Sequence, residues 1–226
     1  MHAWKLAIVF GLSLVFFGCA TRKVGPGEYE QGLYASEQLV DQYGRVEDGA
    51  VSEYLLYLKD RLSEAIPKRH PAKFQYELIM LDTAKPMAFS PGGGFVLFSR
   101  GLLKSLANEA ELAFVLSHEI GHQQLGHTAM LLEDQSLLDD KPYQRELELA
   151  ADEYAIGLMA LAGYDPRVCA FALTHSYRAL DHIPDDEGYP DLDTRLGAIH
   201  ELLKGSDWRP PGTVDRRAFQ ELRISL

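Results

Sequence analysis

Hydrophobic residues repeat at intervals of three and four along much of the chain, which is the spacing of a helix with one buried face. The segments with this pattern are residues 49–66, 108–124, 143–162, 165–180 and 194–203. Asn108 stands where it can cap the second segment, with Glu111 three residues later as its capping-box partner. Pro67 after the first segment and Gly163 after the third are typical of helix ends, so we expect helices over these segments.

Two shorter segments are richer in strand-forming residues. Residues 74–81 and 95–99 combine aromatic and aliphatic side chains, and residues 91–94 form a glycine-rich turn before the second segment. Residues 128–142 show only a weak helical pattern, and the chain after Gly205 shows none that can be interpreted. The pattern as a whole predicts a helix-rich α+β domain with a small sheet.

An apolar run near the N-terminus has a different character. Residues 6–17 are almost entirely hydrophobic, but they are too few to span a bilayer as a helix, which needs about 20 residues. The run is followed by a glycine and Cys19, which is similar to the cleavage box of bacterial lipoproteins. We expect a signal peptide over residues 1–18, lipidation of Cys19, a tether over residues 19–28 and one domain over residues 29–226. An uncleaved anchor and an ordinary signal peptide are the alternatives.

Composition and charge narrow the classes of protein that fit. Hydrophobic residues make up 46% of the 226 residues and charged residues 24%, which excludes a disordered or collagen-like chain. Lys and Arg number 22 against 33 Asp and Glu, a net charge of -11 with no basic run, so we expect no nucleic-acid partner. The two cysteines, Cys19 and Cys169, are too few for a disulfide framework, and Cys169 is expected to pack as a small buried side chain.

The strongest chemical signal is the HExxH sequence at residues 118–122, within the helix that Asn108 is expected to cap. His118 and His122 are four residues apart, so their imidazoles leave the same helix face one turn apart and can bind one metal ion. Glu119 lies beside that face, where it can act as a general base toward a water molecule. This pattern predicts a catalytic zinc site.

A catalytic zinc ion takes three protein ligands, so one more must come from elsewhere in the chain. Glu148 and Asp152 are four residues apart on one predicted helix, where Glu148 can complete a His₂Glu set and Asp152 can accept a hydrogen bond from a zinc-binding histidine. Glu146, on the same helix, remains an alternative ligand by this reasoning. His127 does not fit the spacing of the extended three-histidine motif, and on a continuous helix it would lie opposite His118, so we expect a supporting or structural residue there.

These motifs resemble those of the HtpX/Oma-like zinc metallopeptidases, a family that includes the Ste-type CAAX-prenyl proteases; the short lipoprotein and periplasmic members are the most similar in kind. The resemblance covers roughly half of the chain, through AFSPGG at 88–93, SRGLL at 99–103, HEIGH at 118–122, ELAAD at 148–152 and AGYDP at 162–166. It implies a zincin-type domain with a small sheet edge next to the HExxH helix. It also implies one Zn²⁺ ion bound by His118, His122 and Glu148, because the family's third ligand is the Glu of its ExxAD motif.

The chain departs from the family pattern at two places. Met87 stands where the family usually has Asn, and Tyr189-Pro190 stands where it has His-Pro, with Arg195 at the family's interval. The resemblance places the family histidine over the metal, so Tyr189 is expected either to donate a hydrogen bond to the oxyanion of the reaction or to bind zinc in a resting state; the alternative is an ordinary loop residue. We expect Arg195 to bind acidic groups near the site, with support of the oxyanion as a second alternative.

The motifs and the resemblance together predict a zinc metalloendopeptidase, tethered through Cys19 to the periplasmic face of a bacterial outer membrane. Its expected substrates are polypeptides, in particular misfolded or unassembled envelope proteins, aligned along the 95–99 strand as on a sheet edge. The alternative is a non-catalytic, zinc-stabilised lipoprotein that acts as a chaperone or assembly factor. Glu119 argues against this alternative, since a structural zinc site needs no general base. A prenyl-protein protease is disfavoured, because that activity needs a membrane chamber and no internal apolar stretch is long enough to span a bilayer.

Overall fold

The computed structural model describes residues 26–68, 74–134, 136, 140–179, 190–205 and 216–226. Its helices are α1 (Pro26–Tyr43), α2 (Gly49–Ala65), α3 (Arg100–Ser105), α4 (Glu109–Gln124), α5 (His127–Glu133), α6 (Lys141–Leu161), α7 (Cys169–Ala179), α8 (Leu192–Leu203) and α9 (Arg216–Ser225). Its strands are β1 (Glu77–Leu81), β2 (Ala88–Gly92) and β3 (Phe95–Ser99), and a 3₁₀ turn, Pro166–Val168, precedes α7. The expected signal peptide, Cys19 and Tyr189 lie outside the described residues.

The strands form one small mixed sheet in the order β1–β3–β2. β1 runs parallel to β3, and β2 runs antiparallel to β3 with Ala88 opposite Phe98. Three successive glycines at 92–94 have positive φ, which lets the chain reverse tightly between β2 and β3. The expectation that the 95–99 strand is the sheet edge is therefore wrong. That strand is central, and the edge strand is β2, whose Pro91 and Gly92 made it look like part of a turn.

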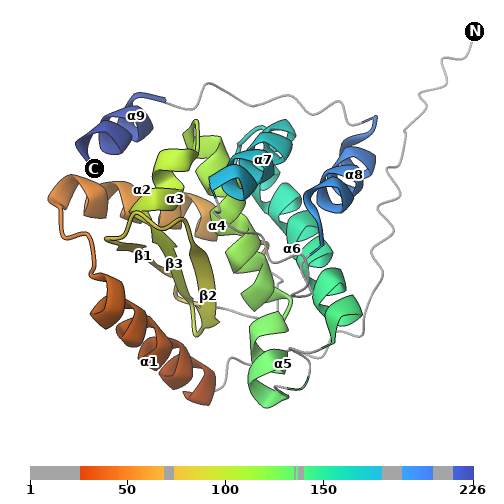
Figure 1. Ribbon diagram of the computed structural model, residues 1–226, viewed down its shortest axis with the longest axis horizontal. Coiled ribbons are helices and arrows are strands. Elements are labelled where there is room, and N and C mark those ends of the chain that lie inside the picture. Colours follow the sequence, from red (N-terminus) through yellow and green to blue (C-terminus); the bar gives the residue numbers. More distant parts are fainter. Residues whose placement is uncertain (1–25, 69–73, 135, 137–139, 180–189, 206–215) are drawn as a thin grey trace, which may run out of the picture.

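Both faces of the sheet are covered by helices. Side chains alternate along β1 and β3, so each of these strands contributes buried residues to both faces. One set joins the main core with residues of α2, α4, α6 and α7: Leu78, Met80, Val96 and Phe98. The other set packs against α1: Ile79, Leu81, Phe95 and Leu97. Figure 1 shows the result, with α1 on one side of the sheet and α4 on the other. The sheet is thus a layer between α1 and the helices that carry the HExxH and ELAAD sequences.

Helix α4 carries the HExxH sequence and packs against both β2 and α6. Asn108 caps it as predicted: its side chain accepts a hydrogen bond from the Glu111 N–H at 3.1 Å, and the Glu111 carboxylate accepts one from the Ala107 N–H at 2.9 Å. The two helices approach closely at Gly121, where a Cβ atom would lie 3.3 Å from the Ala151 carbonyl oxygen. Small residues at this crossing bring the HExxH and ELAAD sequences within side-chain reach of each other.

Two side chains fix the β2–β3 hairpin against α4. Gln123 is fully buried, and its amide accepts a hydrogen bond from the Gly94 N–H at 2.7 Å and donates one to the Phe95 carbonyl at 2.9 Å. Ser90 on β2 donates a hydrogen bond to the Glu119 carbonyl oxygen at 2.9 Å. These bonds hold the edge strand beside the HExxH segment, as the resemblance implied.

The other predicted helices are present with ends shifted by a few residues, whereas α1, α3, α9 and β2 were not predicted, and α5 lies mostly in the segment that showed only a weak helical pattern. α1 begins at Pro26, a residue suited to the first turn of a helix, and Glu28 in that turn is buried. The segment expected as a tether, residues 19–28, therefore already belongs to the folded domain from Pro26 onward.

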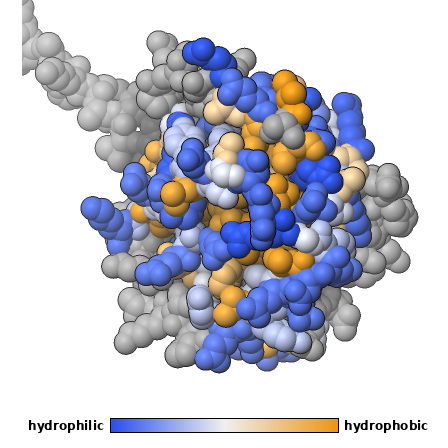
Figure 2. All heavy atoms as spheres, turned by 90° about the vertical axis from the view of Figure 1, so that its left-hand side faces the viewer, coloured by the Kyte–Doolittle hydropathy of each residue, from blue (hydrophilic) through white to orange (hydrophobic). Residues whose placement is uncertain are grey.

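On the side of the molecule that α1 faces, hydrophilic residues run in bands with hydrophobic residues exposed between them (Figure 2). Across the described ranges, no helix is both long and apolar enough to cross a membrane.

Candidate metal centre

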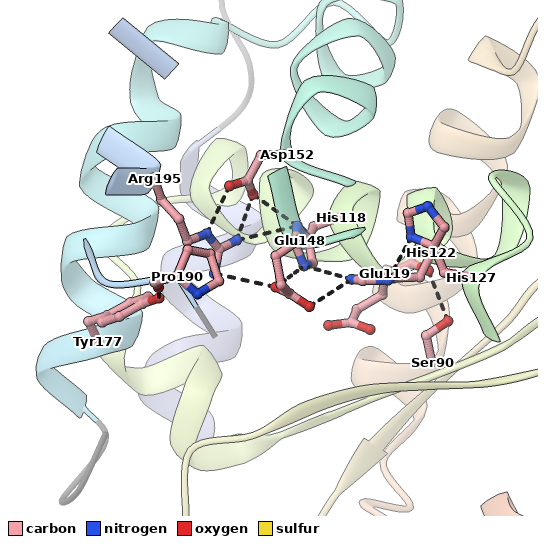
Figure 3. A network of polar contacts seen from close by, with 10 residues as sticks. All are labelled: Ser90, His118, Glu119, His122, His127, Glu148, Asp152, Tyr177, Pro190 and Arg195. Atoms are coloured by element: carbon pink, nitrogen blue, oxygen red, sulfur yellow. Dashed lines mark hydrogen bonds and ion pairs between the residues drawn. The ribbon is translucent and has the colours of Figure 1, made fainter. Parts of the chain in front are cut away.

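His118 and His122 of α4 meet Glu148 of α6 at one point (Figure 3). The His118 Nε2 atom lies 3.1 Å from the His122 Nε2 atom and 3.3 Å from one carboxylate oxygen of Glu148. The His122 Nε2 atom lies 3.3 Å from the other oxygen of Glu148. Within the described part of the chain, this is the one group of three or more His, Cys, Asp or Glu side chains that could hold a metal ion. Glu146, the alternative considered from sequence, is exposed on α6 and is not part of the group.

The spacing of these atoms fits a zinc ion. Ligand atoms that lie 2.0–2.2 Å from a tetrahedral ion are about 3.3–3.6 Å from one another. The distances of 3.1, 3.3 and 3.3 Å within the group are close to this range, so small side-chain shifts would admit the ion. Two imidazoles and one carboxylate are also the donor set of catalytic zinc sites that leave a fourth position for water.

Asp152 and Arg195 support His118 from the side away from Glu148. Asp152 is 1% exposed, and one of its oxygens lies 2.9 Å from the His118 Nδ1 atom. Arg195 donates hydrogen bonds to both oxygens of Asp152, at 2.6 and 2.8 Å, and also lies 3.7 Å from Glu148. With Nδ1 bound to Asp152, the ring of His118 is oriented with Nε2 toward the other ligands. The guanidinium of Arg195 is thus occupied by carboxylates, which is the first of the two roles expected for it.

His127 lies on the other side of His122. α4 ends at Gln124, and Gly126, with a φ of 83°, starts α5 in a new direction. As a result, the Nδ1 atom of His127 lies 3.1 Å from the Nδ1 atom of His122. His127 is buried, and this burial, together with the neighbouring His122, lowers its pKa to about 3. The continuous-helix reasoning missed this turn, although His127 is outside the ligand group, as that reasoning also predicted.

The charges of the site are arranged to receive a cation. Burial opposes a charge on His118, but hydrogen bonds to Asp152 and Glu148 outweigh it and raise the His118 pKa to about 10. Burial would likewise raise the pKa of Glu148, but its hydrogen bonds to His118 and His122 hold that pKa well below its usual value. A metal ion that binds here displaces protons from these ligands and takes over the role of their positive charge.

Glu119 is also affected by its surroundings. Burial raises the pKa of Glu119, which favours a carboxylate that can accept a proton near neutral pH.

The ligands form one wall of a cleft of about 750 Å³. Glu119 reaches this cleft from α4, and Figure 3 shows its carboxylate on the same side of the helix as that of Glu148. The edge strand β2 contributes Ala88 to the cleft, and Val115 of α4 and Leu173 of α7 contribute apolar side chains to its lining. A cleft of this volume, with convergent polar groups at one point of an apolar lining, is typical of a substrate site.

Comparison with known protein families agrees with this geometry. The chain matches the model of peptidase family M48 over residues 55–139 and that of peptidase U49 over residues 104–210. Both matches include the HExxH sequence, and the second also includes Glu148 and Asp152. Together the two matches extend over residues 55–210 and make the chain similar to the M48-type metallopeptidases. The resemblance found in the sequence motifs is therefore confirmed at the level of the family.

The chain is also similar to several named proteases. It is 28% identical over 171 residues to the mitochondrial metalloendopeptidase OMA1 of Arabidopsis thaliana, a match that covers 64% of this chain and 35% of the relative. It is 29% identical over 147 residues to the beta-barrel assembly-enhancing protease of Escherichia coli, covering 65% and 28%. The protein of that name from Yersinia pestis is 35% identical over 112 residues, covering 49% and 22%. The chain thus matches only about a third or less of the length of these relatives.

Sequence reasoning missed the roles of two residues that shape this site. Ser90 and Gln123 hold the edge strand against α4; Ser90 lies within the AFSPGG sequence and Gln123 directly after HEIGH, but no role was expected for either. The signal available in the sequence was weak: Gln123 follows HEIGH directly and faces the glycine turn only after the chain has folded. Polar residues that follow a metal-binding motif directly are worth testing for this kind of bridging contact.

Proposed function

We propose that this chain is a zinc-dependent endopeptidase that hydrolyses peptide bonds in unfolded or unassembled polypeptides. The observation that carries the proposal is the group of His118, His122 and Glu148, with ligand atoms 3.1–3.3 Å apart, beside Glu119 in an open cleft. A structural zinc site would be closed by a fourth protein ligand, and the ligand group in the described residues has three members. This contrast favours an enzyme over the non-catalytic zinc-stabilised lipoprotein.

The residues of the site can divide the reaction between them. A bound zinc ion supplies a Lewis acid that makes water more acidic and polarises the scissile carbonyl. Glu119 accepts the proton of the attacking water and returns it to the leaving amine. Asp152, held by Arg195, keeps His118 in the orientation needed for metal binding. Tyr189, which directly precedes Pro190 in the sequence, is the proposed hydrogen-bond donor to the oxyanion.

The edge strand offers a main-chain site for substrate. The Met87 carbonyl oxygen accepts a hydrogen bond from the Ser99 N–H at 2.9 Å, so Met87 directs its main chain toward β3. Because main-chain groups alternate along a strand, Ala88 directs its N–H and C=O to the free edge, in the cleft. Further along this edge, the Ser90 carbonyl accepts a hydrogen bond from Thr128. We therefore expect an extended substrate to add as a strand at Ala88, which takes the role first assigned to the 95–99 strand.

The sequence and the names of the relatives together support a proposed cellular setting. Lipidation at Cys19 would tether the domain to the periplasmic face of the outer membrane. The name of the Escherichia coli relative, a beta-barrel assembly-enhancing protease, supports a role in quality control of envelope proteins. An acidic chain with a peptide-sized cleft also fits polypeptide substrates and not nucleic acid.

Metal removal provides the test of the proposed activity. We expect the purified chain to cleave an unfolded protein such as reduced casein, to lose this activity after dialysis against a chelator, and to regain it with one equivalent of Zn²⁺. Cleavage is followed by release of a fluorescent label, and zinc content is measured in the same samples. Cleavage that survives complete removal of the metal would contradict the proposal.

The apolar lining of the cleft predicts the side chains that flank the cleaved bond. Val115 lies one turn before Glu119 on α4 and is half-buried at the cleft wall. We expect the wild-type chain to prefer peptides with Phe or Leu next to the cleaved bond over peptides with Ala. Val115→Phe fills part of this space, so kcat/KM for the Phe peptide is expected to fall about 10-fold or more relative to the Ala peptide. An equal change for both peptides would show that Val115 does not set specificity.

A further inference from the structure

The two histidines of the HExxH sequence have different neighbours on their outer sides. The Nδ1 atom of His118 lies 2.9 Å from the Asp152 carboxylate, whereas the Nδ1 atom of His122 lies 3.1 Å from the Nδ1 atom of His127. The rings of His122 and His127 meet edge to face at 74°, with centroids 5.1 Å apart. His127 is 4% exposed, so it is a built-in part of the site and not a surface residue.

We propose that His127 is the positioning residue for the second metal ligand: it accepts a hydrogen bond from the Nδ1–H of His122 and thereby keeps the Nε2 atom of His122 free for the ion. This inference rests on the metal site of the proposed function. It assigns a role to a histidine that no motif of the chain required.

The direction of this hydrogen bond follows from the chemistry of imidazole. A neutral imidazole has one N–H donor and one acceptor nitrogen, and two facing nitrogens need one proton between them. If His127 were the donor, the proton of His122 would sit on Nε2, the atom that faces His118 and Glu148 at 3.1 and 3.3 Å. That proton would block the metal. Only the opposite arrangement, with the proton on Nδ1 of His122 and an acceptor on His127, is compatible with a metal ion.

The backbone places this acceptor. α4 ends at Gln124, and the left-handed conformation of Gly126 starts α5 in a new direction. His127 therefore does not continue α4, and its side chain lies against His122 (Figure 3). A residue with a Cβ atom at position 126 would be strained in this conformation, so the turn depends on glycine.

A neutral acceptor also suits the charge of the site. Glu119, Glu148 and Asp152 already bring three carboxylates to the two ligand histidines, and Arg195 is the cation that contacts two of them. An Asp or Glu in place of His127 would orient His122 equally well, but it would add another buried negative charge. An imidazole orients the ligand without that cost.

Substitutions at His127 can separate the effect of the hydrogen-bond acceptor from the effect of side-chain size. In His127→Asn, the amide oxygen can occupy the position of Nδ1, one bond beyond Cγ. In His127→Gln, the amide lies one atom further along, near the position of Nε2. We expect zinc affinity, measured by competition with a chromophoric chelator, to stay within about threefold of wild type for His127→Asn. We expect it to fall about 10- to 100-fold for His127→Gln and His127→Leu, the range typical of partners that orient metal ligands.

The visible spectrum of the Co²⁺-substituted full chain gives a second readout, since a misoriented His122 changes the ligand field. His200→Gln, at an exposed histidine on α8, is the matched control and is expected to behave as wild type. Wild-type affinity in His127→Gln, or a loss in His127→Asn as large as in His127→Leu, would overturn the inference. A wild-type chain that binds no zinc would instead overturn the proposed function itself.

Discussion

Replacing Glu119 with Gln is expected to reduce cleavage of an unfolded polypeptide by about 10²–10⁴-fold, the usual contribution of a general acid–base group. Gln has nearly the same shape as Glu, but its amide cannot accept the proton of the attacking water. Glu119 is outside the three-member ligand group, so the variant is expected to keep its zinc. Its carbonyl bond to Ser90 involves the main chain and is unaffected by the substitution.

The measurement compares kcat on a labelled unfolded protein with the zinc content of the same preparation. Glu153→Gln is the matched control, because Glu153 is an exposed acid on α6, and it is expected to retain wild-type activity. A zinc-loaded Glu119→Gln variant that cleaves at the wild-type rate would show that another group is the base.

Replacing Glu148 with Gln is expected to weaken zinc binding by more than about 100-fold, beyond the range found for residues that only orient ligands. The carboxylate supplies the one anionic donor of the group, and it contacts both His118 and His122 at 3.3 Å. A neutral amide is a poorer zinc ligand, and Gln also removes the charge that Arg195 faces at 3.7 Å. Activity is therefore expected to be lost together with the metal and to return in part at high zinc concentration.

Glu146→Gln is the control for this prediction, because Glu146 is the other acid that the sequence allowed as a ligand. Isothermal titration of the metal-free proteins with Zn²⁺ compares the two variants directly. We expect wild-type affinity for Glu146→Gln, since its side chain is exposed and outside the group. Equal losses for both variants, or a loss confined to Glu146→Gln, would contradict the ligand assignment.

The local part of the site was predictable from sequence for a simple reason. The positions of His118, Glu119 and His122 relative to one another depend on helix geometry alone, and Asn108 marked the start of that helix. Glu148 was harder, because its approach depends on how two helices cross. The small residues Gly121 and Ala151 permit that crossing, but the sequence reasoning reached Glu148 over Glu146 only through a family resemblance.

The edge strand and the place of His127 could not be predicted in the same way. β2 contains Pro91 next to Gly92, a combination typical of turns, and its pairing with β3 becomes visible only in three dimensions. His127 follows a glycine whose left-handed conformation redirects the chain, so extrapolating the helix put the side chain on the wrong side. α1 was missed because it is rich in polar residues and its hydrophobic pattern is therefore weak. The sheet residues that bury it lie far away in the sequence.

The most direct test of the account is the location of the metal in a crystal of the zinc-loaded chain, measured by anomalous scattering at the zinc absorption edge. We predict one strong peak about 2.0–2.2 Å from the Nε2 atoms of His118 and His122 and from a carboxylate oxygen of Glu148, with a fourth position open to the cleft. A peak that involves other residues, or a fourth protein ligand that closes the site, would contradict it.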